Sequence, residues 1–278
     1  MDLNWFESFL YGLFSGLADI LPVSAEAHRI LMLKFFGIKS DNTLLNLFVH
    51  LALFGALYLT CQKQIVRMSR AQALKRVPKR KRRRPLDTRC VMDLSLLITM
   101  LVPGVLSMFL YQHAAVLGGK LMWIAVFLLV NGVILYIPQF LPTGNRDSRT
   151  MSRVEGLLMG LGGGLGILPG MSSMGAALSV GSVGGVDRGY SLTMALLMNL
   201  GINAGYIVLD VMGLITGGVG TLSFMILVRY IFTAAVTFAG AFLGIKLMRS
   251  LAANNGFSLF AFYCWGISLF TFILNLMA

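Results

Sequence analysis

Two interrupted apolar segments, residues 16–24 and 164–172, repeat one pattern in the two halves of the chain. Each holds Gly-Leu, then Ile-Leu-Pro, then a serine two or three residues later. Three long apolar runs follow each of them. In membrane proteins built from repeats, broken hydrophobic segments at corresponding positions of the two halves point to the binding site. The pattern therefore predicts a repeat-built membrane protein with its site between the two broken segments.

The other long apolar runs indicate an all-α integral membrane fold. Hydrophobic residues make up 57% of the chain and charged residues only 12%. A helix needs about 20 apolar residues to cross a bilayer, and six runs meet this length: 43–62, 92–112, 119–141, 189–212, 222–248 and 257–277. Two further stretches, 5–36 and 154–187, are interrupted by glycine, proline and polar residues. Irregular backbone at membrane depth must be covered by protein or water, so we expect two re-entrant helix hairpins.

Lysine and arginine are concentrated in one loop, which orients the predicted spans. The net charge is +12, and 12 of the 23 basic residues lie between Lys63 and Arg89. Such a run is typical of a cytoplasmic loop beside anionic lipid head groups. It contains no aromatic residue for base stacking, so we do not expect nucleic acid as a partner. With residues 63–89 in the cytoplasm, the predicted outer loops 113–118 and 213–221 contain no lysine or arginine.

This placement requires both interrupted stretches to be re-entrant, and it gives the two halves opposite orientations. The hairpin at 5–36 then enters from outside, and the hairpin at 154–187 enters from inside. Each is followed by three spans. We therefore predict two inverted repeats, residues 1–141 and 142–278, with both termini outside.

Ionisable and hydroxyl side chains crowd the first interrupted stretch. Asp19, Ser24, Glu26 and His28 lie around Pro22, and polar groups inside a membrane are costly enough to indicate function. We expect Ser24, Glu26 and His28 to bind a substrate, and only Asp19 and His28 remain as candidates for catalysis. The alternative for Glu26 and His28 is a position near the mouth of the hairpin, in contact with water or lipid head groups.

The second interrupted stretch offers hydroxyls and backbone amides without charge. Gly170, Ser172 and Ser173 follow a proline, and a glycine-rich turn that opens a helix can hold a phosphate through its N–H groups. The alternative is a tight turn made only for close helix packing. Arg229 is a further candidate for binding an anionic ligand; its alternatives are snorkelling to the outer surface and pairing with Asp210.

In these motifs the chain resembles the undecaprenyl-pyrophosphate phosphatase family of bacterial membrane proteins. That family carries Glu-Gly-Leu-x-Glu-x-Leu-Pro-x-Ser-Ser-x-x-His in its first half and Pro-Gly-x-Ser-Arg-Ser-Gly in its second. The resemblance runs over nearly the whole chain. The motif residues that stand unchanged are Pro22, Ser24, His28, Pro169, Gly170, Ser172 and Gly175.

The departures fall on the charged and hydroxyl positions of the family motifs. Ser15 and Asp19 stand where the family has glutamates, and Ala25 stands where it has a serine. Ser173 and Met174 replace the Arg-Ser pair of the second motif. Phosphoanhydride hydrolysis needs charge neutralisation on the phosphoryl oxygens and an activated nucleophile. The loss of the arginine and of a motif hydroxyl therefore predicts a degenerate catalytic site.

The resemblance implies six spans plus two re-entrant hairpins in inverted repeats, and a polyprenyl carrier lipid as ligand. We expect the chain to bind a polyprenyl phosphate for recognition or translocation, in carrier recycling at a bacterial cytoplasmic membrane. An active diphosphatase with an altered site is the first alternative, and a non-catalytic partner of envelope enzymes is the second.

We expect no metal site, because the three cysteines lack metal-ligand spacing, and no cofactor beyond a divalent cation if the chain is hydrolytic. Membrane lipids at the basic loop and a homodimer are the remaining partners considered.

Cysteine labelling tests the predicted orientation in a background without the three native cysteines. Asp41→Cys should react with an impermeant maleimide from outside and Arg80→Cys only from inside, because this placement satisfies the asymmetry of lysine and arginine. Labelling of both positions from one side would contradict the inverted-repeat layout.

Overall fold

Long helices make up most of the chain. The computed structural model describes residues 3–38, 42–218, 222–253 and 257–277. Among these residues, six helices are long and apolar enough to cross a membrane. They are α3 (Thr43–Arg76), α4 (Thr88–Ser107) continued by η2 (Met108–Leu110) and α5 (Tyr111–Gly118), α6 (Leu121–Tyr136) continued by η3 (Ile137–Phe140), α9 (Arg188–Gly217), α10 (Phe224–Ala253) and α11 (Ser258–Met277). All six predicted spans are confirmed as helices, and the protein is a multi-pass membrane protein.

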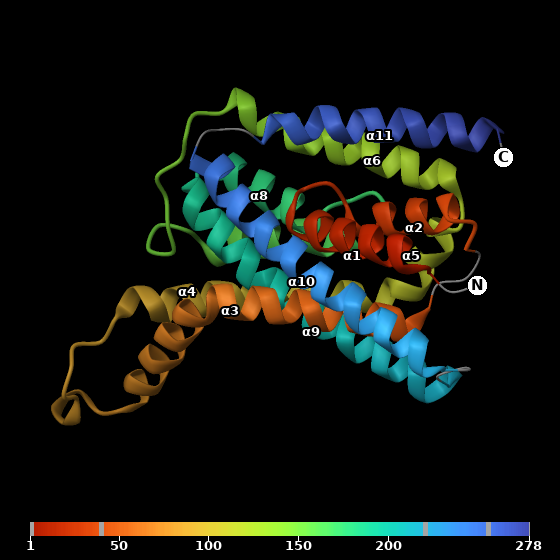
Figure 1. The fold of residues 1–278 in the computed structure, drawn as a ribbon. Coiled ribbons are helices and arrows are strands. Elements are labelled where there is room, and N and C mark those ends of the chain that lie inside the picture. Colours follow the sequence, from red (N-terminus) through yellow and green to blue (C-terminus); the bar gives the residue numbers. More distant parts are fainter. Residues whose placement is uncertain (1–2, 39–41, 219–221, 254–256, 278) are drawn as a thin grey trace.

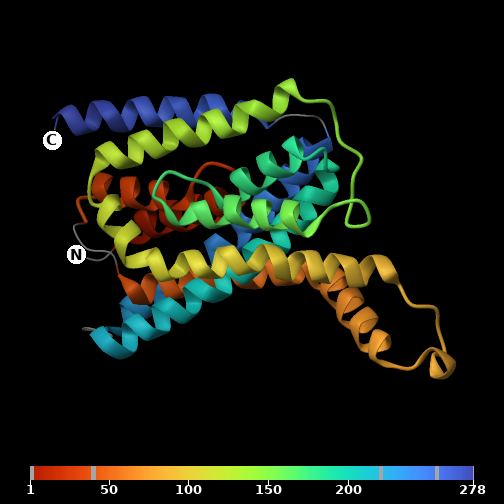
Figure 2. The ribbon, with the colours of Figure 1, turned by 180° about the vertical axis from the view of Figure 1, so that it is seen from behind.

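Two pairs of shorter helices occupy the interrupted stretches. The first pair is α1 (Trp5–Ile20) and α2 (Ala25–Phe35); the second is α7 (Arg153–Gly164), extended by η4 (Leu165–Ile167), and α8 (Ser173–Val183). Each pair turns back toward the end of the bundle from which it came, and the two pairs come from opposite ends (Figures 1 and 2). Their re-entrant path through a bilayer and the inverted relation of the two halves stay predictions.

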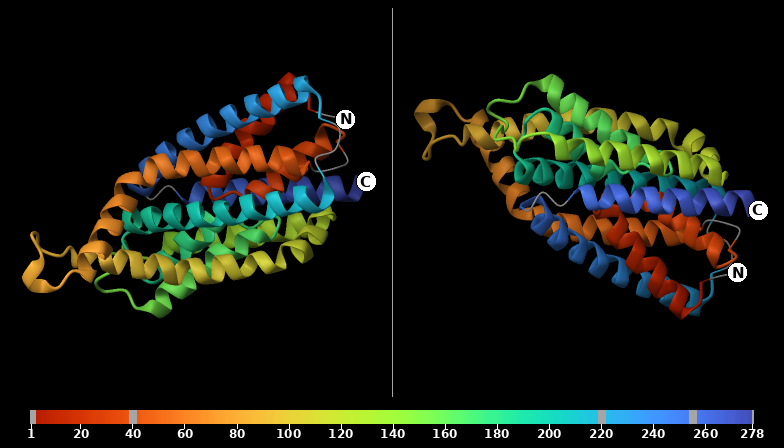
Figure 3. Two further views of the ribbon diagram at one scale, coloured as in Figure 1. Left: turned by 90° about the horizontal axis from the view of Figure 1, so that it is seen from below. Right: turned by 90° about the horizontal axis from the view of Figure 1, so that it is seen from above.

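The basic segment lies at one end of the helix bundle, and the start of α1 and the end of α11 lie at the other. Helix α1 begins and α11 ends at one end, and the segment after α3 projects from the other (Figures 1 and 3). Helix α3 continues to Arg76 and α4 begins at Thr88, so much of the predicted basic loop is helical; the segment between these helices contains the short η1 (Lys79–Lys81). The helix ends before Pro78 because a proline disfavours helical backbone in the residue before it. Position 41, the outer labelling site, lies outside the described residues.

The short helices are held by close packing against long ones. Helix α1 packs against α10, and α7 packs against α4. Glycines permit the close approach of α1 to α10. A Cβ atom on Gly16 would lie 2.2 Å from the carbonyl oxygen of Thr237 and 2.8 Å from the amide nitrogen of Ala241. Small residues at such contacts are the usual means by which membrane helices approach closely.

Gly16→Ala should therefore lower the melting temperature of the purified protein in detergent. The added methyl group would force α1 away from α10, and overpacking of this kind costs about 1–3 kcal/mol. Gly266→Ala in α11 is the matched control, because a Cβ atom there meets nothing within 4 Å. Equal melting temperatures for the two variants would contradict the close approach of α1 and α10.

Candidate functional site

The turns of the two hairpins meet inside the bundle and hydrogen bond to each other. The hydroxyl of Ser24, which caps α2, accepts the N–H of Gly170 at 3.0 Å. Asn131 of α6 links the same two turns: its amide nitrogen donates to the carbonyl of Pro22 at 3.0 Å, and its oxygen accepts the N–H of Ser172 at 3.0 Å. These bonds satisfy backbone groups that neither hairpin can satisfy by itself.

The backbone at this meeting point adopts conformations that few residues tolerate. Ser24 has a φ of 67°, and it is the one non-glycine residue with positive φ in the described part of the chain. Gly170 has a φ of 122°, and a Cβ atom there would lie 2.6 Å from the Cβ of Phe127. Sparsely populated backbone of this kind is concentrated at functional sites.

A small polar cavity, here called the central pocket, lies beside the two turns. It is lined by Ala18, Asp19, Ala25, Glu26, Arg29, Gly166, Met171, Ser172, Ser173, Asn199, Ile202 and Tyr206. Its volume is about 30 Å³, which holds a water molecule or two. A phosphate group needs more room, so the pocket is closed to such a ligand in this structure.

Arg29 supplies the positive charge of the central pocket. Its Nη2 donates to Oε2 of Glu26 at 2.7 Å, and its Nη1 donates to Nε2 of His50 at 3.0 Å. The arginine side chain is only 9% exposed. The forked guanidinium holds both partners at once, which a lysine ammonium does less well. Arg29 was not among the residues predicted for the site, although Glu26 three positions earlier on the same predicted helix was a signal for a partner.

The contact with Arg29 selects the tautomer of His50. A guanidinium can only donate hydrogen bonds, so the Nε2 that faces it must be unprotonated. The proton then sits on Nδ1, which donates to Oδ2 of Asp210 at 2.6 Å. His50 also stacks on Tyr206, with ring centroids 5.0 Å apart. Hydrogen bonds thus run continuously from Glu26 in the pocket to Asp210 on α9.

Asparagine amides and serine hydroxyls form the rest of the polar lining. The carboxylate of Asp19 accepts from Nδ2 of Asn199 at 2.8 Å and from Nδ2 of Asn203 at 3.2 Å. The hydroxyl of Ser172 is engaged as the cap of α8. The hydroxyl of Ser173 has no hydrogen-bond partner among the described residues, so it is free to contact a ligand.

The structure brings most of the predicted site residues together. Glu26, Ser172 and Ser173 line the central pocket, as does Asp19. Ser24 and Gly170 lie beside it, where they join the two turns. Their predicted roles in binding stay predictions, but the geometry now places them at one point.

His28 and Arg229 do not line the central pocket. His28 Nδ1 donates to the carbonyl of Ser24 at 2.7 Å, and its Nε2 accepts from the hydroxyl of Tyr263 at 2.7 Å; its ring lines a separate apolar groove between α1 and α11. Arg229 donates to the carbonyl of Leu3 near the start of α1. Asp210 pairs with His50, so the pairing of Arg229 with Asp210 considered from the sequence does not occur.

Metal-binding side chains do not gather in the described part of the chain. No group of three or more histidine, cysteine, aspartate or glutamate residues there could hold a metal ion. Asp19 and Glu26, the two carboxylates of the pocket, are engaged by asparagine amides and by Arg29. The need for a divalent cation in hydrolysis stays a prediction.

Comparison with known proteins confirms the resemblance drawn from the motifs. The model of a family described as "Bacitracin resistance protein BacA" matches residues 8–270. An undecaprenyl-diphosphatase of Methanobrevibacter smithii is 27% identical, over 96% of this chain and 96% of its own length. Undecaprenyl-diphosphatase 1 of Shouchella clausii is 26% identical, over 98% of this chain and 96% of its own. An undecaprenyl-diphosphatase of Bacteroides fragilis is 26% identical, over 98% of this chain and 99% of its own length.

His50→Ala should destabilise the protein. It would leave Asp210 without its donor and Arg29 with one partner fewer in a buried place, and an unsatisfied buried polar group costs about 1–3 kcal/mol. The measurement is the melting temperature in detergent. His113→Ala, at an exposed histidine, is the matched control and should change it little. If both variants melt alike, the hydrogen-bonded chain from Glu26 to Asp210 does not stabilise the fold.

Proposed function

Because the chain belongs to the bacitracin resistance protein BacA family, we propose that it binds the phosphate head of a polyprenyl phosphate carrier lipid in the central pocket. The role is recognition or translocation of this lipid, with hydrolysis much weaker than in relatives that keep the full motifs. The names of the undecaprenyl-diphosphatase relatives support the class of lipid. The central pocket supports binding without efficient cleavage.

The position and pairing of Arg29 carry the proposal. It is the one cationic side chain that lines the central pocket in the described chain, and it comes from the first hairpin instead of the second motif, where Ser173 stands. In the closed arrangement this guanidinium is neutralised by Glu26. A phosphate monoester can replace Glu26 as the partner of Arg29 and gain charge-assisted hydrogen bonds.

Cleavage makes a larger electrostatic demand than binding. The transition state of phosphoryl transfer spreads negative charge over several oxygens, and catalysis depends on groups preorganised to stabilise it. The central pocket contains one guanidinium, that of Arg29, and two carboxylates, those of Asp19 and Glu26. Hydroxyls such as that of Ser173 and the backbone amides can hold an anion without neutralising it. This charge balance is too poor in positive charge to stabilise the transition state of diphosphate hydrolysis.

The meeting of the hairpins supports movement of the head group. The two turns beside the central pocket belong to hairpins that come from opposite ends of the bundle (Figures 1 and 2). Separation of the turns, with loss of the bond between Gly170 and Ser24, would open the pocket toward one end. Opening on alternate sides around a fixed midplane site is the usual mechanism of transporters built from inverted repeats.

A working diphosphatase with an altered site is the second candidate. The names of the relatives favour it. Arg29 favours it too, because it supplies the pocket with a guanidinium that the second motif lacks. Release of phosphate from a long-chain isoprenyl diphosphate separates the two candidates. We expect a rate at least ~100-fold below that of a relative with complete motifs, since loss of one preorganised donor alone costs about that much. Comparable rates would establish the second candidate.

Binding is tested by the shift in melting temperature that a polyprenyl monophosphate causes, since a ligand that binds only the folded state raises it. Arg29→Met should abolish most of the shift, and Arg29→Lys should keep part of it. Arg229→Met is the matched control, because Arg229 is the same residue type in a membrane helix outside the pocket, and its shift should equal that of the parent. His28→Ala should also keep the shift. An unchanged shift in both Arg29 variants would overturn binding in the central pocket.

A further inference from the structure

The cluster of charged groups around the central pocket holds more acidic than basic side chains. Arg29 is its one basic side chain among the described residues, and Asp19 and Glu26 line the same pocket. Asp210 belongs to the cluster through His50, whose Nδ1 lies 2.6 Å from Oδ2 of the aspartate. One guanidinium thus lies beside three carboxyl groups. A phosphate would bring further negative charge into a buried place where unbalanced charge is costly.

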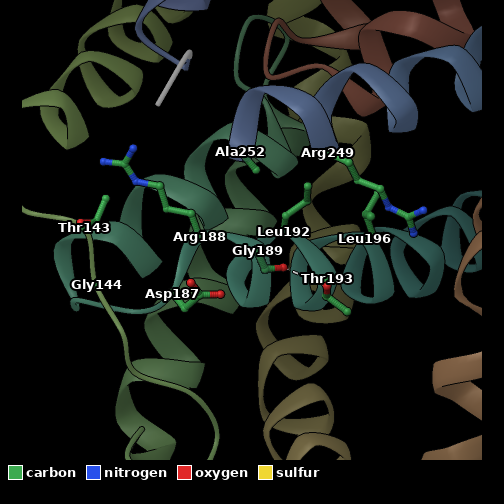
Figure 4. A pocket seen from close by; sticks show the side chains of 10 residues that line it. All are labelled: Thr143, Gly144, Asp187, Arg188, Gly189, Leu192, Thr193, Leu196, Arg249 and Ala252. Carbon is green, nitrogen blue, oxygen red and sulfur yellow. Dashed lines mark hydrogen bonds between the residues drawn. The ribbon is translucent and has the colours of Figure 1, made fainter. Parts of the chain in front are cut away.

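Arginines elsewhere in the fold do not reach this cluster. Arg188 and Arg249 border a larger polar cavity at the end of the bundle that carries the basic segment, where their guanidinium groups point away from each other (Figure 4). Arg188 is the first residue of α9, and the helix rises about 16 Å from there to Asn199 at the central pocket. Arg229 on α10 donates to the carbonyl of Leu3. Protonation within the cluster is therefore the means that the chain itself offers for balancing the charge of a phosphate.

His50 is placed to take up a proton when Arg29 changes partners. Its Nε2 accepts from Nη1 of Arg29 at 3.0 Å, so that nitrogen carries no proton while the contact lasts. A phosphate that draws the guanidinium into the pocket removes this donor and leaves the lone pair of Nε2 free. A proton from solvent that binds there makes an imidazolium, while Nδ1 keeps its own proton and its bond to Asp210. The new charge is then paired with an aspartate that is already in place.

The groups that face His50 leave it as the natural acceptor of this proton. Tyrosines from four other helices lie around this part of α3: Tyr11, Tyr111, Tyr206 and Tyr230. Phenols ordinarily stay neutral below about pH 10. Asp93 of α4 bonds to Gln64, which lies about 21 Å further along α3. The charged groups in contact with His50 are thus Arg29 and Asp210, and histidine is the side chain that most readily changes its charge between pH 5 and 8.

The pair of His50 and Asp210 lies between the central pocket and the end of the bundle opposite the basic segment. Helix α3 begins at Thr43 and α9 ends at Gly217, so both members of the pair are about 10 Å from the ends of their helices. These two helix ends lie at the end of the bundle where α1 begins (Figures 1 and 3). Tyr206, one turn before Asp210 on α9, already lines the central pocket. A proton that enters from that end meets this pair before it reaches the pocket.

We propose that binding of the phosphate head group in the central pocket is coupled to uptake of one proton by His50. The inference rests on the proposed function for the ligand, and it adds a coupled ion to that function. Arg29 is the link, because the turn that brings its guanidinium to the phosphate takes Nη1 away from Nε2 of His50. Release of the head group restores this contact and returns the proton to solvent. Head group and proton are thus taken up and released together.

Isothermal titration calorimetry in buffers of different ionisation enthalpy counts the protons taken up for each ligand bound. The ligand is a polyprenyl monophosphate, and the full chain is studied in an uncharged detergent between about pH 7 and 8. The free ligand is mainly a dianion there, because the second pKa of a phosphate monoester is near 6. The parent should take up about one proton, so its affinity should rise by up to about ten-fold for each unit by which the pH falls. No proton uptake by the parent would overturn the proposal.

A conservative variant assigns the proton to His50. His50→Gln should bind with almost no proton uptake, since a glutamine amide can donate to Asp210 and accept from Arg29 but cannot gain a proton. His113→Gln, at an exposed histidine, is the matched control and should keep the uptake of the parent. Equal uptake by all three proteins would belong to the phosphate itself, and it would contradict the role of His50.

Nitrogen-15 NMR of the parent labelled at its three histidines covers the case in which His50→Gln fails to fold. The shifts of the two ring nitrogens distinguish a neutral ring from an imidazolium, and His28→Ala and His113→Gln assign the other two signals. His50 should be neutral with its proton on Nδ1 in the free protein. Saturation with polyprenyl monophosphate should convert it to an imidazolium and leave His113 unchanged. A neutral His50 ring in both states would refute the coupling.

The two proposals fail in different ways. Binding that depends on Arg29 but takes up no proton would support the central pocket and overturn the coupling alone. Absence of binding by the parent throughout this pH range would overturn the proposed function, and the coupling with it.

Discussion

Each hairpin turn carries backbone N–H and C=O groups that its own helices cannot satisfy, and the opposite hairpin and α6 together supply partners for them. Gly170 donates to Ser24, and Asn131 bridges Pro22 and Ser172. Without water at membrane depth, an unsatisfied group of this kind is costly. The two broken segments are therefore stable mainly as a pair, and the polar site forms where they pair.

The pairing of the turns decides where charge can be placed. Arg29 on the first hairpin reaches the pocket that the second hairpin borders, so one guanidinium serves a site whose usual arginine position holds Ser173. The same guanidinium is tied to Glu26 and His50, and through His50 to Asp210 on α9. Any anion that enters the central pocket must compete with these partners. The proposed binding of a head group in the central pocket would therefore require rearrangement of this buried ionic network.

The sequence by itself determined the six spans and the two interrupted stretches, because span length, apolar content and helix-breaking residues are local properties. It also predicted a site between the two turns, and the central pocket lies beside them. Only the tertiary structure decided which side chains share the pocket. Glu26 and Arg29 are three residues apart and lie on one face of α2, whereas His28 points elsewhere, toward Tyr263 of α11. The contact of Arg29 with His50, and through His50 with Asp210, depends on α3 and α9, which lie far from α2 in the sequence and meet it only in the fold.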